Sequence, residues 1–242
     1  MSNSIGGWIN LGNTAIAEIA SSYLDWIVID LEHTTISLSQ AEELIRVIEL
    51  NGSDSYVRIS HIDESIIKKV LDAGASGIIA PNIHDPEQVN QLKSFAFYNP
   101  MGSRGVGLAR AQGYGNKLKK AEYFENIASE IKIFVQIESS QALTNLEEIF
   151  SQNIHGYFIG PYDLSSSMGI PGQFNNKKFL EAEKHILDIA KKYNILRGFH
   201  VVEPDLPEVQ AKLQLGYNNI AFSTDFRILD KTYSSIAGKN IE

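Results

Sequence analysis

The feature that most restricts the fold of this chain is the alternation of short apolar runs with longer amphipathic segments. Each run holds four or five mostly apolar residues, many of them β-branched or aromatic, which is typical of strands buried on both faces of a parallel sheet. The sequence contains eight such runs, at residues 7–10, 26–30, 56–59, 77–80, 133–137, 156–159, 196–200 and 219–222.

Segments with helical periodicity separate the runs, at residues 38–50, 64–73, 85–97, 142–150, 178–193 and 206–215. Strands that alternate with amphipathic helices indicate a parallel sheet covered by helices. Eight such units in 242 residues favour a closed barrel over an open, doubly wound sheet. We therefore expect an α/β fold, a (β/α)8 TIM barrel, formed as a single domain by residues 1–242.

Local signals mark the ends of some helices. Ser39 and Glu42 have the spacing of a capping box, in which each side chain caps a backbone N–H at the start of a helix. Gly74 and Gly216 follow helical segments just before a strand, where a left-handed residue is expected.

Charge and cysteine content exclude several classes of function. With 29 acidic and 21 basic residues the net charge is −8, so we expect no nucleic acid and no membrane surface as partner. The absence of cysteine excludes disulfides, thiolate nucleophiles and Cys-based metal sites. The first residues do not resemble a signal peptide, and no apolar run approaches the roughly 20 residues of a membrane span. We expect a cytoplasmic protein.

Polar side chains gather where the predicted strands end, at the end of a barrel that carries chemistry. The requirements of folding alone do not explain acids, histidines and an arginine at these positions. In chain order the residues are Asp30, Glu32, His33, Arg58, Gln136, Glu138, residues 160–163, His200 and Asp225.

Glu138 and Asp163 are the candidate metal ligands. They follow adjacent strands, and two carboxylates suit a hard divalent cation that keeps positions open for other ligands. Alternatively, Glu138 caps the next helix and Asp163 caps the turn after Gly160 and Pro161. Position alone leaves both interpretations open.

Arg58 is a charged residue within an otherwise apolar strand. Burial of a charge is costly unless the charge is paired, so Arg58 is expected to face the barrel mouth and to hold an oxygen on which negative charge develops. The alternative is an internal salt bridge to a structural acid.

His33 follows the acidic residues Asp30 and Glu32. Asp72 lies at the end of the helix after the third strand and could orient the His33 ring. His33 would then act as the base and Asp72 as the acid that holds it in place. The alternative is that His33 is a loop histidine without a functional role. His200 and Asp225 are weaker candidates, with structural or substrate-flanking roles.

Residues 101–115 form a loop rich in glycine that carries Arg104 and Arg110. It does not follow a strand, so it is neither a dinucleotide-binding fingerprint nor a P-loop. Two interpretations remain: the loop reaches the active site of its own or a neighbouring subunit, or it is a long surface loop.

With these residues in place, the chain resembles the HpcH/HpaI aldolases, the metal-dependent class II pyruvate aldolases. The resemblance spans roughly residues 12–226. It is carried by six motifs in the same order, DWIVIDLEH (25–33), VR (57–58), LDAGA (71–75), RGVG (104–107), VQIE (135–138) and GPYDLS (160–165).

The resemblance implies a role for each matching residue. Glu138 and Asp163 would hold Mg²⁺, Mn²⁺ or Co²⁺, Arg58 would contact the keto or enolate oxygen, and His33 with Asp72 would form the acid–base dyad. The substrate carboxylate would meet backbone amides near Gly160 to Asp163, a stretch that includes Pro161 and Tyr162, with Gln136 beside the site.

The resemblance also implies a homo-oligomer, trimeric or hexameric, whose last helix, near residues 226–237, is exchanged between subunits. Two departures concern the aldehyde-binding side. His200 occupies a position that is often aliphatic, and the loop after Arg104 is shorter than in several relatives, so Arg104 and His200 are the candidates for the acceptor side.

The expected activity is cleavage or formation of 4-hydroxy-2-oxo acids, from pyruvate and an aldehyde, through a metal-stabilised enolate. Two alternatives stay open. One is a related lyase or synthase acting on another oxo acid or a CoA ester, as in citrate formation or cleavage, and the other is a non-catalytic barrel. A Schiff-base route needs a lysine at a strand's carboxyl end, whereas Lys132 lies at the wrong end of its strand.

Overall fold

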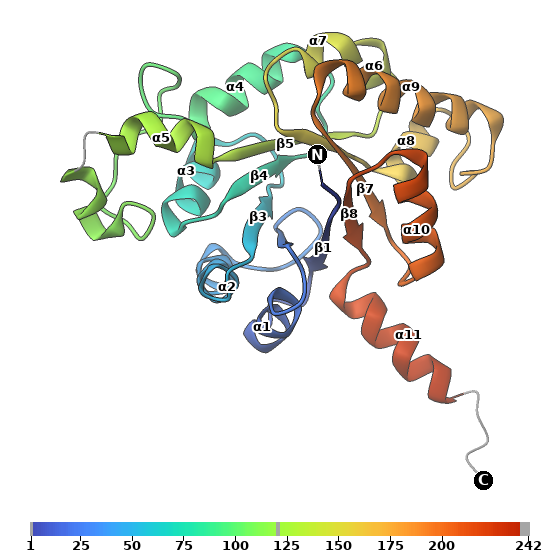
Figure 1. Cartoon of the computed structure of the whole chain (residues 1–242), viewed down its shortest axis with the longest axis horizontal. Helices are drawn as coiled ribbons and strands as arrows, with labels where there is room; N and C mark the ends of the chain where they lie inside the picture. Colours follow the sequence, from blue (N-terminus) through green and yellow to red (C-terminus); the bar gives the residue numbers. More distant parts are fainter. Residues whose placement is uncertain (1, 120–121, 238–242) are drawn as a thin grey trace.

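Eight parallel strands close into a barrel in chain order in the computed structural model, which describes residues 2–119 and 122–237. Figure 1 shows the strands as a central ring with helices outside it. The predicted (β/α)8 barrel is confirmed, and each predicted run is a strand. The strands are β1 (Ser4–Ile9), β2 (Trp26–Asp30), β3 (Asp54–Arg58), β4 (Gly77–Ala80), β5 (Lys132–Ile137), β6 (Gly156–Ile159), β7 (Leu196–Val201) and β8 (Asn219–Phe222).

Helices cover the outside of the barrel and include all six predicted segments. They are α1 (Thr14–Ser21), α2 (Leu38–Leu50), α3 (Glu64–Ala73), α4 (Pro86–Ala96), α5 (Glu122–Glu130), α6 (Ser140–Thr144), α7 (Leu146–Phe150), α8 (Pro161–Ser167), α9 (Lys177–Tyr193), α10 (Leu206–Leu215) and α11 (Asp225–Ala237). The long stretch between β4 and β5 holds α4, the short 3₁₀ turns Gly113–Gly115 and Lys117–Lys119, and α5. None of the helices in the described part of the chain has the length and apolar character needed to cross a membrane.

The start of α2 corrects one local prediction. The N-cap is Ser37 rather than Ser39, and Ser37 forms a capping box with Gln40 instead of Glu42. The two C-terminal glycines are as predicted: Gly74 and Gly216 have φ of 105° and 111°, in the left-handed region.

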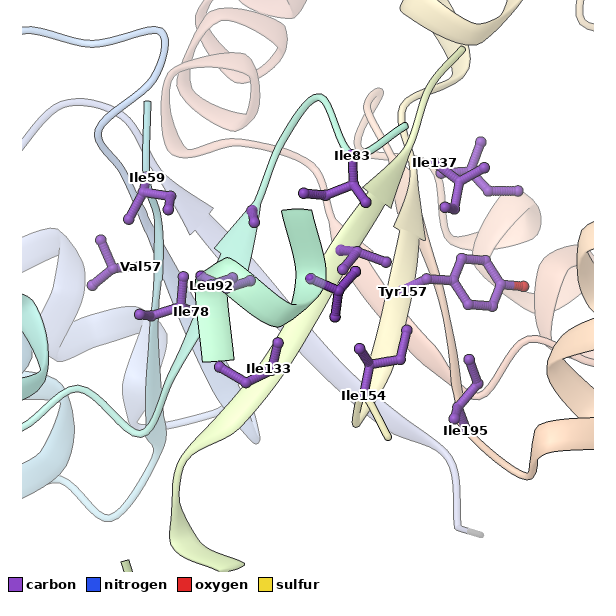
Figure 2. Close-up of a cluster of buried hydrophobic side chains, with 14 of the residues drawn as sticks. Val57, Ile59, Ile78, Ile83, Leu92, Ile133, Ile137, Ile154, Tyr157 and Ile195 are labelled. Atoms are coloured by element: carbon purple, nitrogen blue, oxygen red, sulfur yellow. The ribbon is translucent and has the colours of Figure 1, made fainter. Parts of the chain in front are cut away.

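The core has an outer and an inner layer. Figure 2 shows the outer layer, where side chains such as Val57, Ile78 and Ile133 from the strands meet Leu92 of α4. The inner layer fills the barrel itself and is dominated by aromatic rings. Because both faces of each strand are buried, the strands are continuous apolar runs in the sequence.

Glycine makes room for the large rings inside the barrel. Trp26 is 2% exposed and its ring occupies the space beside Gly6 in β1. A Cβ added at Gly6 would lie only 2.1 Å from this ring. The pairing of a glycine with a tryptophan therefore fills the barrel without a clash.

α11 points away from the barrel toward the C-terminal end of the described chain (Figure 1). Its apolar side chains remain well exposed, with Tyr233 69% and Ile236 50% accessible. A groove of about 350 Å³, with an almost entirely apolar lining, runs between β1, α1, β8 and the start of α11. Among the described residues, nothing covers this groove or the apolar side chains of α11.

We expect Gly6→Ala to lower the free energy of unfolding by about 1–3 kcal/mol, because the new methyl group must displace Trp26 from a closely packed interior. Gly105→Ala is the matched control, since no atom lies within 4 Å of its added Cβ, and it should change stability by less than about 0.5 kcal/mol. Urea unfolding followed by tryptophan fluorescence measures both. Equal effects of the two substitutions would contradict this account of the barrel interior.

Candidate active site at the carboxyl ends of the strands

Arg58 is held by a two-point ion pair with Asp30 on the neighbouring strand. The parallel register of β2 and β3 sets the two residues side by side. Arg58 Nε and Nη2 donate to the two carboxylate oxygens of Asp30 at 2.8 and 2.7 Å. Burial by itself would raise the pKa of Asp30, but the hydrogen bonds and charge of Arg58 outweigh it and lower that pKa. A bidentate pair of this kind fixes the guanidinium in one orientation.

Glu32 adds a second acid to the guanidinium. Its carboxylate lies 3.0 Å from Arg58 Nη1, and the same nitrogen donates to Gln136 Oε1 at 3.4 Å. Burial raises the pKa of Glu32, the charge of Arg58 opposes this, and the charges of Asp30 and Asp163 add to it. The internal salt bridge to an acid is therefore present, and Arg58 also lines the cavity at the strand ends. Its contact with a substrate oxygen stays a prediction.

Glu138, just after β5, is a buried carboxylate with two protein donors. Its Oε1 accepts from the backbone N–H of Asn82 at 2.6 Å and its Oε2 accepts from Gln136 Nε2 at 3.1 Å. Asn82 has a left-handed backbone, φ 55°, at the end of β4. Gly160 lies close by, since a Cβ added there would be 2.8 Å from Glu138 Oε2.

The surroundings of Glu138 disfavour its charge. Burial raises its pKa to about 7, the Asn82 N–H opposes this, and the nearby charges of Glu32 and Asp163 raise it further. Three acidic groups that repel one another around a single arginine are the electrostatic signature of a site for a positive charge.

A cavity of about 130 Å³ opens beside these groups, large enough for a small organic acid. Every predicted substrate-binding position lines it, namely Gln136, Gly160, Pro161, Tyr162 and Asp163, together with Arg58 and His200. Asp163 belongs to the first turn of α8. The strand ends therefore bring these predicted residues to one place.

His33 lies near the rim but is not paired with Asp72. Its ring is 67% exposed and approaches Glu32 at 3.8 Å. Asp72 is near the end of α3, which runs back from the rim toward the amino ends of the strands. Asp72 instead accepts hydrogen bonds from Arg104 and Gln112 at 2.6 and 2.9 Å. The predicted dyad within one chain is therefore wrong.

Arg104 is also not among the residues that line the cavity. It is 3% exposed, lies over the Tyr98 ring and contacts the Ala96 carbonyl in addition to Asp72. A buried, paired arginine cannot contact an aldehyde in its own chain. Its predicted place on the acceptor side of that chain is a second correction.

His200 and Asp225 have different surroundings. The His200 ring stacks on Trp8, with centroids 4.6 Å apart, and lines the cavity. Asp225 accepts from the backbone N–H groups of Asn10 and Leu11 at 3.1 and 3.0 Å. Asp225 therefore secures the loop after β1.

Three residues of the site had no role assigned to them from the sequence. Trp8 lies under the Arg58 guanidinium at 5.1 Å and lines the cavity. Glu32 is two positions beyond Asp30, and the side chains of alternate residues share one face of a strand, so its place near Arg58 was open to inference. The role of Asn82 depends on a backbone N–H, which side-chain chemistry does not reveal.

The donor set suits a hard divalent cation. In the described ranges, no group of three or more His, Asp or Glu side chains converges as a complete metal site. Two carboxylates with the remaining positions left to water and substrate oxygens are a usual arrangement for Mg²⁺ or Mn²⁺. The raised pKa of Glu138 fits this, since a bound cation would stabilise its ionised form.

Comparison with known protein families agrees with this geometry. The profile described as HpcH/HpaI aldolase/citrate lyase matches residues 4–229. The chain belongs to the HpcH/HpaI aldolase/citrate lyase family. It is therefore an enzyme, a carbon–carbon lyase, as the sequence predicted.

Individual relatives match most of the chain. It is 34% identical over 228 residues to 2-keto-3-deoxy-L-rhamnonate aldolases of Escherichia coli (strain K12) and Shigella boydii, covering 91% of this chain and 82% of each relative. An HpcH/HpaI aldolase from Desulfitobacterium hafniense DCB-2 superposes with a TM-score of 0.90 at 27% identity, over 99% of this chain and 93% of that one. The citrate synthase SbnG, at 23% identity, shares the fold with a TM-score of 0.85, over 100% and 96%.

The pH dependence of stability should report the Glu138 environment. In the folded, metal-free protein Glu138 keeps its proton up to about pH 7, against 4.5 for an ordinary glutamate. A raised folded pKa contributes stability that is present below pH 4.5 and is lost as the pH rises through 7. We compare the free energies of unfolding of the wild type and of Glu138→Gln with a chelator present. The difference, wild type minus variant, should fall by about 3 kcal/mol as the pH rises from below 4.5 to above 7.

The control for this measurement is Glu87→Gln, a substitution at an exposed position of α4. Because this side chain is exposed to water, its difference from the wild type should vary much less than that of Glu138→Gln over the same pH range. Denaturant titrations at several pH values measure both differences, and a flat profile for Glu138→Gln would contradict the assigned environment.

Proposed function

We propose that this lyase is a divalent-metal-dependent aldolase that cleaves and forms 4-hydroxy-2-oxo acids of the 2-keto-3-deoxy sugar-acid type, with pyruvate as one product. The observation that carries the proposal is the buried Glu138 carboxylate, which is electrostatically coupled to Asp163 beside a fixed guanidinium. The relatives named as 2-keto-3-deoxy-L-rhamnonate aldolases support the choice of substrate class.

Glu138 and Asp163 are the residues that would hold the cation. Bound there, Mg²⁺, Mn²⁺ or Co²⁺ supplies Lewis acidity that stabilises negative charge developing on the keto oxygen of the substrate. Gln136 holds Glu138 in place from the cavity side, and Gly160 leaves room for the carboxylate.

Arg58 contributes a fixed positive charge. Its contacts with Asp30 and Glu32 leave the guanidinium at the cavity wall in a set orientation. A donor that is already in place stabilises an enolate oxygen without the cost of reorganisation during the reaction. Asp30 and Glu32 act here as positioning residues.

His33 is the proposed acid–base group. The ring lies at the rim beside Glu32, and an imidazole exchanges protons readily near neutral pH. In cleavage it would take up the proton of the 4-hydroxyl, and in synthesis it would return that proton. The backbone at residues 160–163, which lines the cavity, would receive the substrate carboxylate.

The surroundings of Lys132 argue against the Schiff-base route. Lys132 begins β5, at the amino end of the barrel, and pairs with Asp54 at 2.5 Å. A nucleophilic lysine must instead be desolvated near the reacting carbonyl.

Purified protein supplied with Mg²⁺, Mn²⁺ or Co²⁺ should release pyruvate from 2-keto-3-deoxy-L-rhamnonate and related acids, measured with lactate dehydrogenase and NADH. Removal of the metal with EDTA should abolish turnover, and borohydride should leave it unchanged. Glu138→Gln and Asp163→Asn should each lower kcat/KM by at least about 10²-fold, because each removes charge that the transition state requires. The exposed Glu87→Gln is the matched control.

Full activity after verified removal of metal would contradict the proposal. Turnover of oxaloacetate or acyl-CoA in place of the sugar acids would favour the related synthase or lyase. No turnover of any substrate, and no thermal stabilisation by Mn²⁺ with pyruvate, would favour a non-catalytic barrel.

We also propose that the chain works as a homo-oligomer in which α11 covers the apolar groove of a second copy. The groove lies beside the start of α11 and includes the exposed Ile19 and Tyr23 of the α1 region. Uncovered apolar surface of this extent on both a helix and a groove is typical of a subunit interface, and exchange between identical copies would bury both.

The double substitution Ile228→Asp and Leu229→Asp should shift the protein to a smaller species in size-exclusion chromatography with light scattering, because it puts charge into the groove contact. Lys177→Asp, at an 89% exposed side chain of α9, is the control and should leave the mass unchanged. A wild type that elutes as a monomer would contradict helix exchange.

A further inference from the structure

We propose that His200 determines which aldehydes the enzyme accepts, by receiving a hydrogen bond from a hydroxyl group on the aldehyde-derived half of the substrate. This inference rests on the proposed aldolase function and assigns a ligand class to one wall of the cavity. That wall is formed by Trp8 of β1 and by His200 and Val202 at the end of β7.

The chemistry of His200 follows from its partner. Its Nε2 lies 3.1 Å from the backbone carbonyl oxygen of Ser223. A carbonyl oxygen only accepts, so Nε2 must carry the hydrogen and donate it. In the neutral ring the other nitrogen, Nδ1, is then a bare acceptor. Within the described chain Nδ1 has no hydrogen-bond donor.

The ring stays neutral under ordinary conditions. Burial lowers the pKa of His200 to about 4, the bond to Ser223 opposes this, and the charge of Arg58 adds to it, while Asp30 acts the other way. The tautomer with an accepting Nδ1 is therefore the state that meets substrate.

The ring is also held in one plane. It stacks on Trp8 with an angle of 11° between the rings, and Trp8 packs edge-on against Phe158. The parallel register places His200 beside Ala221 of β8. Ser223, just after β8, has a left-handed backbone with φ of 55°. Because the ring is fixed, Nδ1 can accept a hydrogen bond from only one direction.

A fixed acceptor distinguishes the two halves of the substrate. The carboxylate and keto group of the 2-oxo acid half offer only acceptors at neutral pH, and Arg58 and the proposed cation suit them. Hydroxyl groups on the aldehyde half are the donors that remain for Nδ1. An aliphatic side chain at this position could not bind a hydroxyl group by a hydrogen bond. A neutral imidazole can, and so favours substrates that carry one.

The test measures aldol synthesis from pyruvate with two aldehydes of nearly equal shape, lactaldehyde and 2-methylpropanal, in the presence of Mg²⁺. The wild type should prefer lactaldehyde in kcat/KM. His200→Leu should reduce this preference about tenfold, the worth of one well-placed hydrogen bond, with the larger loss on lactaldehyde. His200→Asn keeps a polar atom near the Nδ1 position and should restore part of the preference.

A second readout does not depend on turnover. In ¹⁵N spectra of histidine-labelled protein, the resonance of the unprotonated His200 Nδ1, assigned by its loss in His200→Leu, should move when lactaldehyde is added with pyruvate. It should move less with 2-methylpropanal.

The outcomes separate the two proposals. An unchanged aldehyde preference in His200→Leu, or equal losses on both aldehydes, overturns the role of His200 while leaving the aldolase function in place. Failure of the wild type to join pyruvate to either aldehyde overturns the proposed function itself.

Discussion

Burial of the Glu138 carboxylate next to two other acids is the constraint on which the site depends. Glu138 is 7% exposed, and its pKa is raised because water is largely removed and Glu32 and Asp163 lie nearby. The charge of Arg58 lowers this pKa, but burial and the two acids outweigh it, and the direct contacts of Arg58 go to Asp30 and Glu32. The chain therefore holds one carboxylate whose ionised form lacks sufficient positive charge from the protein. A divalent cation is the simplest ligand that supplies it.

The barrel explains how such an unfavourable cluster persists. Parallel register places Asp30 beside Arg58 on neighbouring strands, and packing of aromatic rings below them fills the interior. The site thus sits on a rigid layer of rings, where Trp8 supports both Arg58 and His200. The repulsion among these acids lowers the stability of the folded protein. The core offsets this loss, because its packing does not depend on the acidic side chains.

The strands and the cluster at their carboxyl ends were predictable, because doubly buried parallel strands leave continuous apolar runs and because barrel chemistry gathers at one end. The pairing of His33 with Asp72 was mispredicted for a physical reason. A helix that follows a strand runs back along it, so a residue in its last turn lies near the opposite end of the barrel. Arg104 was misplaced because its burial depends on a salt bridge to Asp72, which lies 32 positions away in the sequence. The Ser223 carbonyl that sets the tautomer of His200 depends on backbone geometry after β8, and side-chain patterns carry no signal for it.

Anomalous diffraction from crystals soaked with Mn²⁺ and pyruvate tests the central claim most directly. We predict one strong peak in contact with carboxylate oxygens of both Glu138 and Asp163, at the cavity wall that also carries Arg58. A peak bound by other residues, or no peak when pyruvate is clearly visible in the cavity, would contradict the account.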